Sequence, residues 1–203
     1  MKRLIIALLT ITILAGCSSS HQEENTASTP TPASTEKVTI TNKADITAFK
    51  ADMSQYKWIT EPYGDFEETT LKESIKMFTE KGSGILYFGY VGCPWCERAV
   101  PNLNKAAVKT GATIYYIDAS VQPDNGDYKE ITGYLASALD KDENGDPEFF
   151  VPLVVGVKNG EIVGSHTSLV DDFTLQSEDD QMSDAQNQEL EDIYTKIIAK
   201  CAD

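Results

Sequence analysis

Two cysteines separated by two residues, Cys93-Pro94-Trp95-Cys96, directly follow the apolar run ILYFGYV at 85–91. Such a run is typical of a strand buried on both faces. Pro94 favours the first position of a helix, where its missing N–H costs nothing. Free backbone N–H groups at that end stabilise a thiolate, and Cys96 lies one helical turn further on. The pattern predicts a redox pair in which one thiolate attacks a disulfide and the other thiol resolves the mixed disulfide.

Three other uses of the cysteine pair are open at this point. A zinc site needs about four ligands, and only Cys201, His21 and His166 are left to complete one. Covalent attachment of c-type haem needs a histidine directly after the second cysteine, where this chain has Glu97. A purely structural disulfide is the third alternative.

The start of the chain has the pattern of an export signal. Met1-Lys2-Arg3 is followed by an apolar run over 4–14, which is much shorter than the ~20 residues that span a bilayer. Leu14-Ala15-Gly16-Cys17 resembles the lipobox of bacterial lipoproteins. The resemblance implies that 1–16 are a cleaved lipoprotein signal peptide and that Cys17 becomes the lipidated first residue, stably anchored by two or three acyl chains. An ordinary signal peptide that contains a cysteine is the alternative.

Composition separates a tether from a domain. Residues 18–37 contain no aliphatic side chain larger than alanine, so 17–37 is predicted to be a flexible tether that reaches roughly 25 Å. Over the whole chain, 17 Lys and Arg stand against 32 Asp and Glu, a net charge of −15. Such a charge repels phosphate backbones, so nucleic-acid partners are excluded.

Hydrophobic periodicity predicts a single α/β domain over 38–203. Buried strands separated by a helix imply a parallel pair, and Lys158-Asn159-Gly160 predicts an antiparallel hairpin. The expected architecture is a mixed central sheet with flanking helices. Helices are expected at 45–56, 65–81, 94–110, 128–139 and 186–201, and strands at 56–60, 85–91, 113–117, 153–157 and 161–164.

The chain resembles the thioredoxin superfamily over roughly 65–200. The strand that enters the CxxC matches the family, Pro101 matches the proline of its active-site helix, and Val151-Pro152 before the hairpin matches its cis-proline strand. The resemblance implies a thioredoxin-like fold in which Pro152 is cis and the Val151 backbone pairs with the substrate chain. An ordinary trans proline at a strand start is the alternative for Pro152.

The resemblance also implies a function. Cys93 would attack and Cys96 would resolve in a thiol–disulfide oxidoreductase that needs no diffusible cofactor and no metal. Tyr90 and Trp95 would form an apolar collar for substrate chains. The chain is similar to exported bacteriocin-transport accessory proteins. The expected partners are exported thiol- or disulfide-containing proteins or peptides and a membrane electron donor or acceptor, at the extracytoplasmic face of a bacterial membrane. A non-catalytic, chaperone-like accessory module of a secretion or bacteriocin export system is the alternative.

Two departures from the family affect the thiolate. Tyr87 stands where cytosolic thioredoxins have a buried aspartate, and Gly92 stands where they have tryptophan. We therefore expect the helix end to supply most of the thiolate stabilisation, with Arg98 helping and Glu97 opposing. An enzyme needs Cys93 to be reachable by a protein thiol and Cys96 to be buried behind it.

Four further features are interpreted as structural. The acidic turn from Asp140 to Glu148 matches most positions of a calcium loop, but Val151 stands where the bidentate glutamate belongs, so a solvated loop is favoured over a calcium site. The acidic segment 171–192 is expected to be a solvated, mobile loop before the last helix, with selection of basic partners as a minor alternative. Cys201 is expected to be a core residue rather than a third redox thiol, and His166 is expected to be structural.

Overall fold

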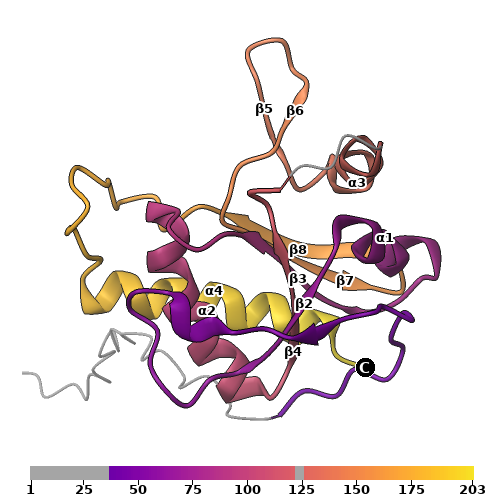
Figure 1. Cartoon of the computed structure of the whole chain (residues 1–203), viewed down its shortest axis with the longest axis horizontal. Helices are drawn as coiled ribbons and strands as arrows, with labels where there is room; N and C mark the ends of the chain where they lie inside the picture. Colours follow the sequence, from indigo (N-terminus) through magenta and orange to yellow (C-terminus); the bar gives the residue numbers. More distant parts are fainter. Residues whose placement is uncertain (1–36, 122–125) are drawn as a thin grey trace, which may run out of the picture. The chain divides into compact units, whose positions relative to one another are not determined.

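The computed structural model describes residues 37–121 and 126–203, and both ranges lie in one compact unit (Figure 1). The predicted signal peptide, Cys17 and almost all of the predicted tether lie outside the described residues. Within the described ranges, no helix is long and apolar enough to cross a membrane.

A six-stranded mixed sheet forms the centre of this unit (Figure 1). Its order is β1-β2-β4-β3-β7-β8. β4 pairs in parallel with both β2 and β3, while β1, β7 and β8 join antiparallel. The mixed sheet and the antiparallel hairpin of β7 and β8 at its edge are as predicted. The strands are β1 Phe49–Lys50, β2 Asp65–Thr69, β3 Gly84–Gly89, β4 Thr113–Asp118, β7 Leu153–Lys158 and β8 Glu161–Thr167.

Helices cover both faces of the sheet (Figure 1). α2 (Pro94–Thr110) and α4 (Asp184–Cys201) pack on one face, and α1 (Leu71–Thr79) and α3 (Asp127–Leu135) pack on the other. Side chains of β3 alternate between these two cores, because successive residues of a strand point to opposite faces. Ile85 and Tyr87 face α2 and α4, whereas Leu86 and Phe88 face α1 and α3.

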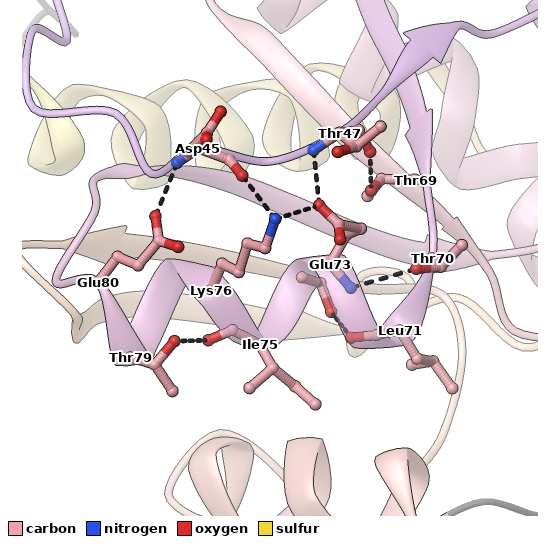
Figure 2. A network of polar contacts seen from close by, with 11 residues as sticks. Asp45, Thr47, Thr69, Thr70, Leu71, Glu73, Ile75, Lys76, Thr79 and Glu80 are labelled. Carbon is pink, nitrogen blue, oxygen red and sulfur yellow. Dashed lines mark hydrogen bonds and ion pairs between the residues drawn. The ribbon is translucent and has the colours of Figure 1, made fainter.

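The helix predicted at 45–56 is wrong, and Figure 2 shows the reason. The backbone N–H groups of Asp45 and Thr47 donate to the carboxylates of Glu80 and Glu73 on α1, at 2.8 and 2.7 Å. Lys76 joins them by donating to Glu73 and to the Asp45 carbonyl oxygen. Because these backbone groups bond to α1, the segment runs extended along that helix and then forms β1 and the short 3-10 helix η1 (Met53–Gln55).

The region 56–81 also differs from the prediction. A strand, β2, occupies the first third of the helix predicted at 65–81, and α1 begins only after Thr70, whose side chain accepts the Glu73 N–H. Residues 56–60 form a turn rather than a strand. Side chains of α2 bond to that turn, because Asn104 donates to the Thr60 carbonyl and Glu97 accepts the Lys57 N–H.

The acidic segment 140–148 is a small hairpin, formed by β5 (Asp140–Lys141) and β6 (Pro147–Glu148), and the helix before it ends at Leu135 rather than 139. Asp142 closes the turn by accepting the N–H groups of Asn144 and Asp146, at 2.8 and 2.9 Å. Across 37–121 and 126–203, no three His, Cys, Asp or Glu side chains are grouped so that they could hold a metal ion. The Asp142 carboxylate is bonded instead to the backbone N–H groups of Asn144 and Asp146.

Candidate active site

The CxxC lies where β3 meets α2. Gly92 has a left-handed backbone, with φ of +87°, a conformation that glycine adopts without strain. Cys93 is the N-cap of α2, and its sulfur accepts the Cys96 N–H at 3.3 Å. Pro94 occupies the first helical position. The strand, the helix and the cap are as predicted, and α2 has the predicted bounds.

Both thiols are free, and both are buried. Cys96 is 0% exposed, as expected of the second cysteine, but Cys93 is only 3% exposed. Cys93 belongs to the core cluster under α2, against which Tyr90 and Val151 also pack. Of the two requirements for an enzyme, the burial of Cys96 is met, whereas access of a protein thiol to Cys93 is restricted by its own burial.

The two sulfurs have opposite pKa shifts. The hydrogen bond with the Cys96 thiol and the backbone N–H groups of Cys96 and Trp95 lower the pKa of Cys93, although burial and the charge of Glu97 act against them. The hydrogen bond to Cys93, burial and the charge on Cys93 raise the pKa of Cys96. The opposite shifts mean that Cys93 loses its proton before Cys96 does.

Glu97 and Arg98 hold the surroundings of the CxxC. The buried Glu97 carboxylate accepts the N–H groups of Gly92, at 2.7 Å, and of Lys57. The negative charge of Glu97 acts to raise the pKa of Cys93, as predicted. Arg98, in contrast, is wrongly predicted as a cation for the thiolate. Its guanidinium stacks on Trp58, 4.6 Å from the ring centre, and donates to the carbonyls of residues 178 and 180.

These bonds also correct the interpretation of the acidic segment 171–192 as a freely solvated loop. Arg98 bonds to its backbone, while Val170 and Met182 at either side are buried. The last helix begins at Asp184, two residues earlier than predicted, with Ser183 and Gln186 forming a capping box. The segment is therefore bonded to the active-site helix.

Tyrosines, rather than a carboxylate, lie under the cysteine pair. Tyr87 is fully buried on β3, and its hydroxyl oxygen lies 3.3 Å from that of Tyr56. Tyr116 stacks on Tyr87, with ring centres 5.5 Å apart. Burial raises the pKa of Tyr87 well above its ordinary value and that of Tyr116 to about 12. These phenols are therefore neutral hydrogen-bonding groups at physiological pH.

The proline strand adjoins the CxxC edge of the sheet. The Val151–Pro152 bond is cis, as predicted; a second cis bond, Glu61–Pro62, was not anticipated. Leu153 pairs with Phe88 near the end of β3, so Val151 and Pro152 lie at the edge where β3 runs into the CxxC loop. Pro152 is buried and Val151 half-buried.

An apolar groove of about 410 Å³ opens beside this edge. Trp95, on the first turn of α2, is 44% exposed, as a collar residue should be. Val91 and Phe150 are exposed to a similar degree on the adjoining loops. The groove is lined by Leu71, Tyr90, Ala119, Ser120, Val121, Tyr128, Phe149 and Val151.

Cys201 and His166, the other two candidate side chains, have structural contacts of their own. Cys201 is fully buried near the end of α4, donates to the Ile197 carbonyl, and has its pKa raised to about 12 by burial. His166 on β8 lies 3.2 Å from the Leu169 carbonyl and packs edge-on against Tyr194. Both positions agree with the structural roles predicted for them.

The order β2-β4-β3-β7-β8, with a CxxC at the N-terminus of the helix after β3 and a cis-proline before β7, defines the fold. It is thioredoxin-like. No family model matches the chain, and no curated protein does. Among solved structures, the crystal structure of thioredoxin from Aeropyrum pernix matches with a TM-score of 0.34 and 21% identity, covering 48% of this chain and 71% of that one.

Sequence reasoning missed Tyr56 and the groove as parts of the site. The signal for a polar cluster was present, because Tyr87 and Tyr116 each lie in a strand that is otherwise mostly apolar. Tyr56, however, lies 31 positions before Tyr87 in the chain. The groove is likewise lined by residues that lie far apart in the sequence, from Leu71 to Val151.

The charge of Glu97 can be tested directly. Glu97→Gln removes the negative charge that raises the pKa of Cys93, so we expect the pKa of Cys93 to fall and its alkylation at pH 6–7 to quicken. The measurement is the pH dependence of iodoacetamide labelling, with Cys93 located by mass spectrometry. Glu130→Gln, at an exposed position of α3, is the matched control and should leave the profile unchanged. An unchanged or upward-shifted profile for Glu97→Gln would contradict this assignment.

Proposed function

We propose that the chain is a thiol–disulfide oxidoreductase in which Cys93 attacks and Cys96 resolves. The observation that carries the proposal is the N-cap position of Cys93, where it receives the Cys96 N–H and has a lowered pKa while its partner has a raised one. A thiolate beside a protonated thiol is the starting state that thiol–disulfide exchange requires.

The proposed reaction transfers two electrons from the pair to a substrate disulfide. The Cys93 thiolate attacks one substrate sulfur, the substrate S–S bond breaks, and the leaving thiolate takes up a proton. Cys96 then loses its proton and attacks the Cys93 sulfur. The Cys93–Cys96 bond forms, and the second substrate sulfur leaves as a thiol; the same steps in reverse oxidise a dithiol.

Substrate binding is assigned to the edge beside the pair. We place an extended substrate segment against the Val151 backbone, next to the buried Pro152, with Trp95 supplying apolar surface. The apolar groove that Tyr90 and Val151 line supports this placement. Because Cys93 is only 3% exposed, the substrate sulfur has to be directed to it along this edge.

The cellular setting belongs to the same proposal. The pattern of residues 1–17 supports lipidation of Cys17 and attachment to the extracytoplasmic face of a bacterial membrane. In that setting the substrates are exported cysteine-containing proteins or peptides, and a membrane protein donates or accepts the electrons.

A second candidate function is a non-catalytic accessory module that binds exported chains. The near-complete burial of Cys93 favours it, because a nucleophile needs access to its substrate. The two candidates differ in whether function requires the sulfur of Cys93.

Substitution of the cysteines one at a time separates the two candidates. Cys93→Ser is expected to reduce catalysed reduction of insulin disulfides by dithiothreitol to the uncatalysed rate. Cys96→Ser is expected to accumulate a mixed disulfide, since attack proceeds without resolution. Cys201→Ala, the matched control at the third described cysteine, should keep activity. A wild-type protein that does not catalyse insulin reduction, together with a Cys93→Ser variant that keeps full biological activity in cells, would instead support the accessory module.

Anchoring has its own test. Cys17→Ser removes the sulfur that would carry the lipid, so the protein is expected to move from the membrane fraction to the soluble fraction. The measurement is cell fractionation followed by immunoblotting. Retention in the membrane fraction with an unchanged mobility would contradict lipidation at Cys17.

A further inference from the structure

The buried tyrosines suggest how a thiolate on Cys96 is stabilised in a site whose buried carboxylate, Glu97, is bonded to backbone N–H groups. Resolution requires Cys96 to become a thiolate, but Cys96 is fully buried and its pKa is raised. A thiol in this position needs a group that stabilises its charge at the moment of attack. The inference below rests on the proposed function, because it concerns the second step of that reaction.

Tyr87 is directed along β3 toward the CxxC. A Cβ placed on Gly89 would lie 2.2 Å from the Tyr87 hydroxyl oxygen, so the phenol lies directly over this glycine. Gly89 is the last residue of β3, at the end that leads to the cysteines. Only a residue without a side chain leaves room for the hydroxyl in this position.

A second phenol holds the first in place. The hydroxyl of Tyr56, from η1, lies 3.3 Å from that of Tyr87, and either can donate. The bond acts to raise the pKa of Tyr87 and to lower that of Tyr56, which favours Tyr87 as the donor in the resting protein. When the bond reverses and Tyr56 donates, the single hydrogen of Tyr87 is free for another acceptor. Tyr87, Tyr56 and Cys96 belong to the same buried cluster. A hydrogen bond from Tyr87 acts to lower the pKa of Cys96, against the larger effects of Cys93 and of burial that raise it.

We propose that the Tyr87 hydroxyl, positioned by Tyr56 and by the space over Gly89, donates to the Cys96 sulfur and stabilises its thiolate in the resolving step. Tyr87 is a catalytic residue in this step because it contacts a reacting sulfur, and it stays protonated throughout; Tyr56, which acts through Tyr87, is a positioning residue. The Cys96 proton leaves to the departing substrate sulfur or to solvent, the Cys96–Cys93 bond forms, and the bond from Cys93 to the substrate breaks. Electrons and protons balance as in the reaction above.

The backbone N–H of Tyr90 also acts to lower the pKa of Cys96, but the charged side chains near the pair are bonded elsewhere. Glu97 bonds to the backbone of Gly92 and Lys57, and Arg98 bonds to carbonyls. The buried Tyr194 hydroxyl has no hydrogen-bond partner in the described structure. The titratable and charged groups that face or adjoin the cysteine pair are Cys93, Tyr90, Glu97 and Arg98 from the loop and α2, Tyr56 from η1, Tyr87 from β3, Tyr116 from β4 and Tyr194 from α4.

The test measures attack and resolution separately. Reduced protein is mixed with excess 5,5′-dithiobis(2-nitrobenzoate) in a stopped-flow instrument. The first release of thionitrobenzoate reports attack by Cys93, and the second reports resolution by Cys96. The Cys96→Ser variant, which can give only the first release, calibrates the two phases.

Tyr87→Phe keeps the ring and removes the donor. We expect the first phase to be unchanged and the second to slow by about 10- to 100-fold at pH 7, the value of a hydrogen bond to a charged group. The difference in second-phase rate between the variant and the wild type should shrink as pH rises. The reason is that loss of the donor raises the pKa of Cys96 and so moves the pH profile of the second phase to higher pH. Tyr56→Phe should give a smaller shift in the same direction. Tyr115→Phe, the same change on the opposite face of the sheet, should alter neither phase.

The outcomes separate this inference from the proposed function. A second phase in Tyr87→Phe equal to the wild type, or a loss that affects both phases alike, overturns the role of Tyr87. Absence of the second phase in the wild type overturns the proposed function itself. Selective slowing of the second phase with a shifted pH profile supports both.

Discussion

The site depends on one hydrogen bond, from the Cys96 N–H to the Cys93 sulfur at the start of α2. It makes Cys93 the cap of the helix and, together with the larger effect of the hydrogen bond from the Cys96 thiol, the favoured thiolate. The residues that begin the helix therefore also prepare the chemistry. The rest of the fold supplies support for this junction. β3 is fixed between β4 and β7, and Glu97 returns from the first turn of α2 to bond the Gly92 loop.

Below this junction the protein places neutral polar groups, while the buried charged side chains of Glu97 and Arg98 are bonded to backbone groups. The tyrosine hydroxyls lie in the core under α2, and their raised pKa values keep them protonated. A neutral donor favours a thiolate on Cys96 without the desolvation cost of a second buried anion. The one nearby carboxylate, Glu97, is occupied by backbone donors.

Local signals made the active-site elements predictable, and long-range bonds explain the errors. An apolar run, a proline at the first helical position and Gly111 after the last turn specify β3 and α2 through neighbours in sequence. The segment at 45–56 has a helical pattern, but carboxylates on α1 bond to its backbone N–H groups. Arg98 stacks on Trp58 instead of turning to Cys93, which no local pattern indicates.

The central claim is that Cys93 and Cys96 form a reversible disulfide. Its most direct test is equilibration of the purified protein with glutathione buffers, followed by acid quenching, alkylation and mass spectrometry of the peptide that contains both cysteines. The account predicts a single two-electron transition with a midpoint within the range of about −120 to −270 mV known for thioredoxin-like pairs. A pair that stays oxidised in strong reductant, or never forms the disulfide in oxidised glutathione, would contradict it.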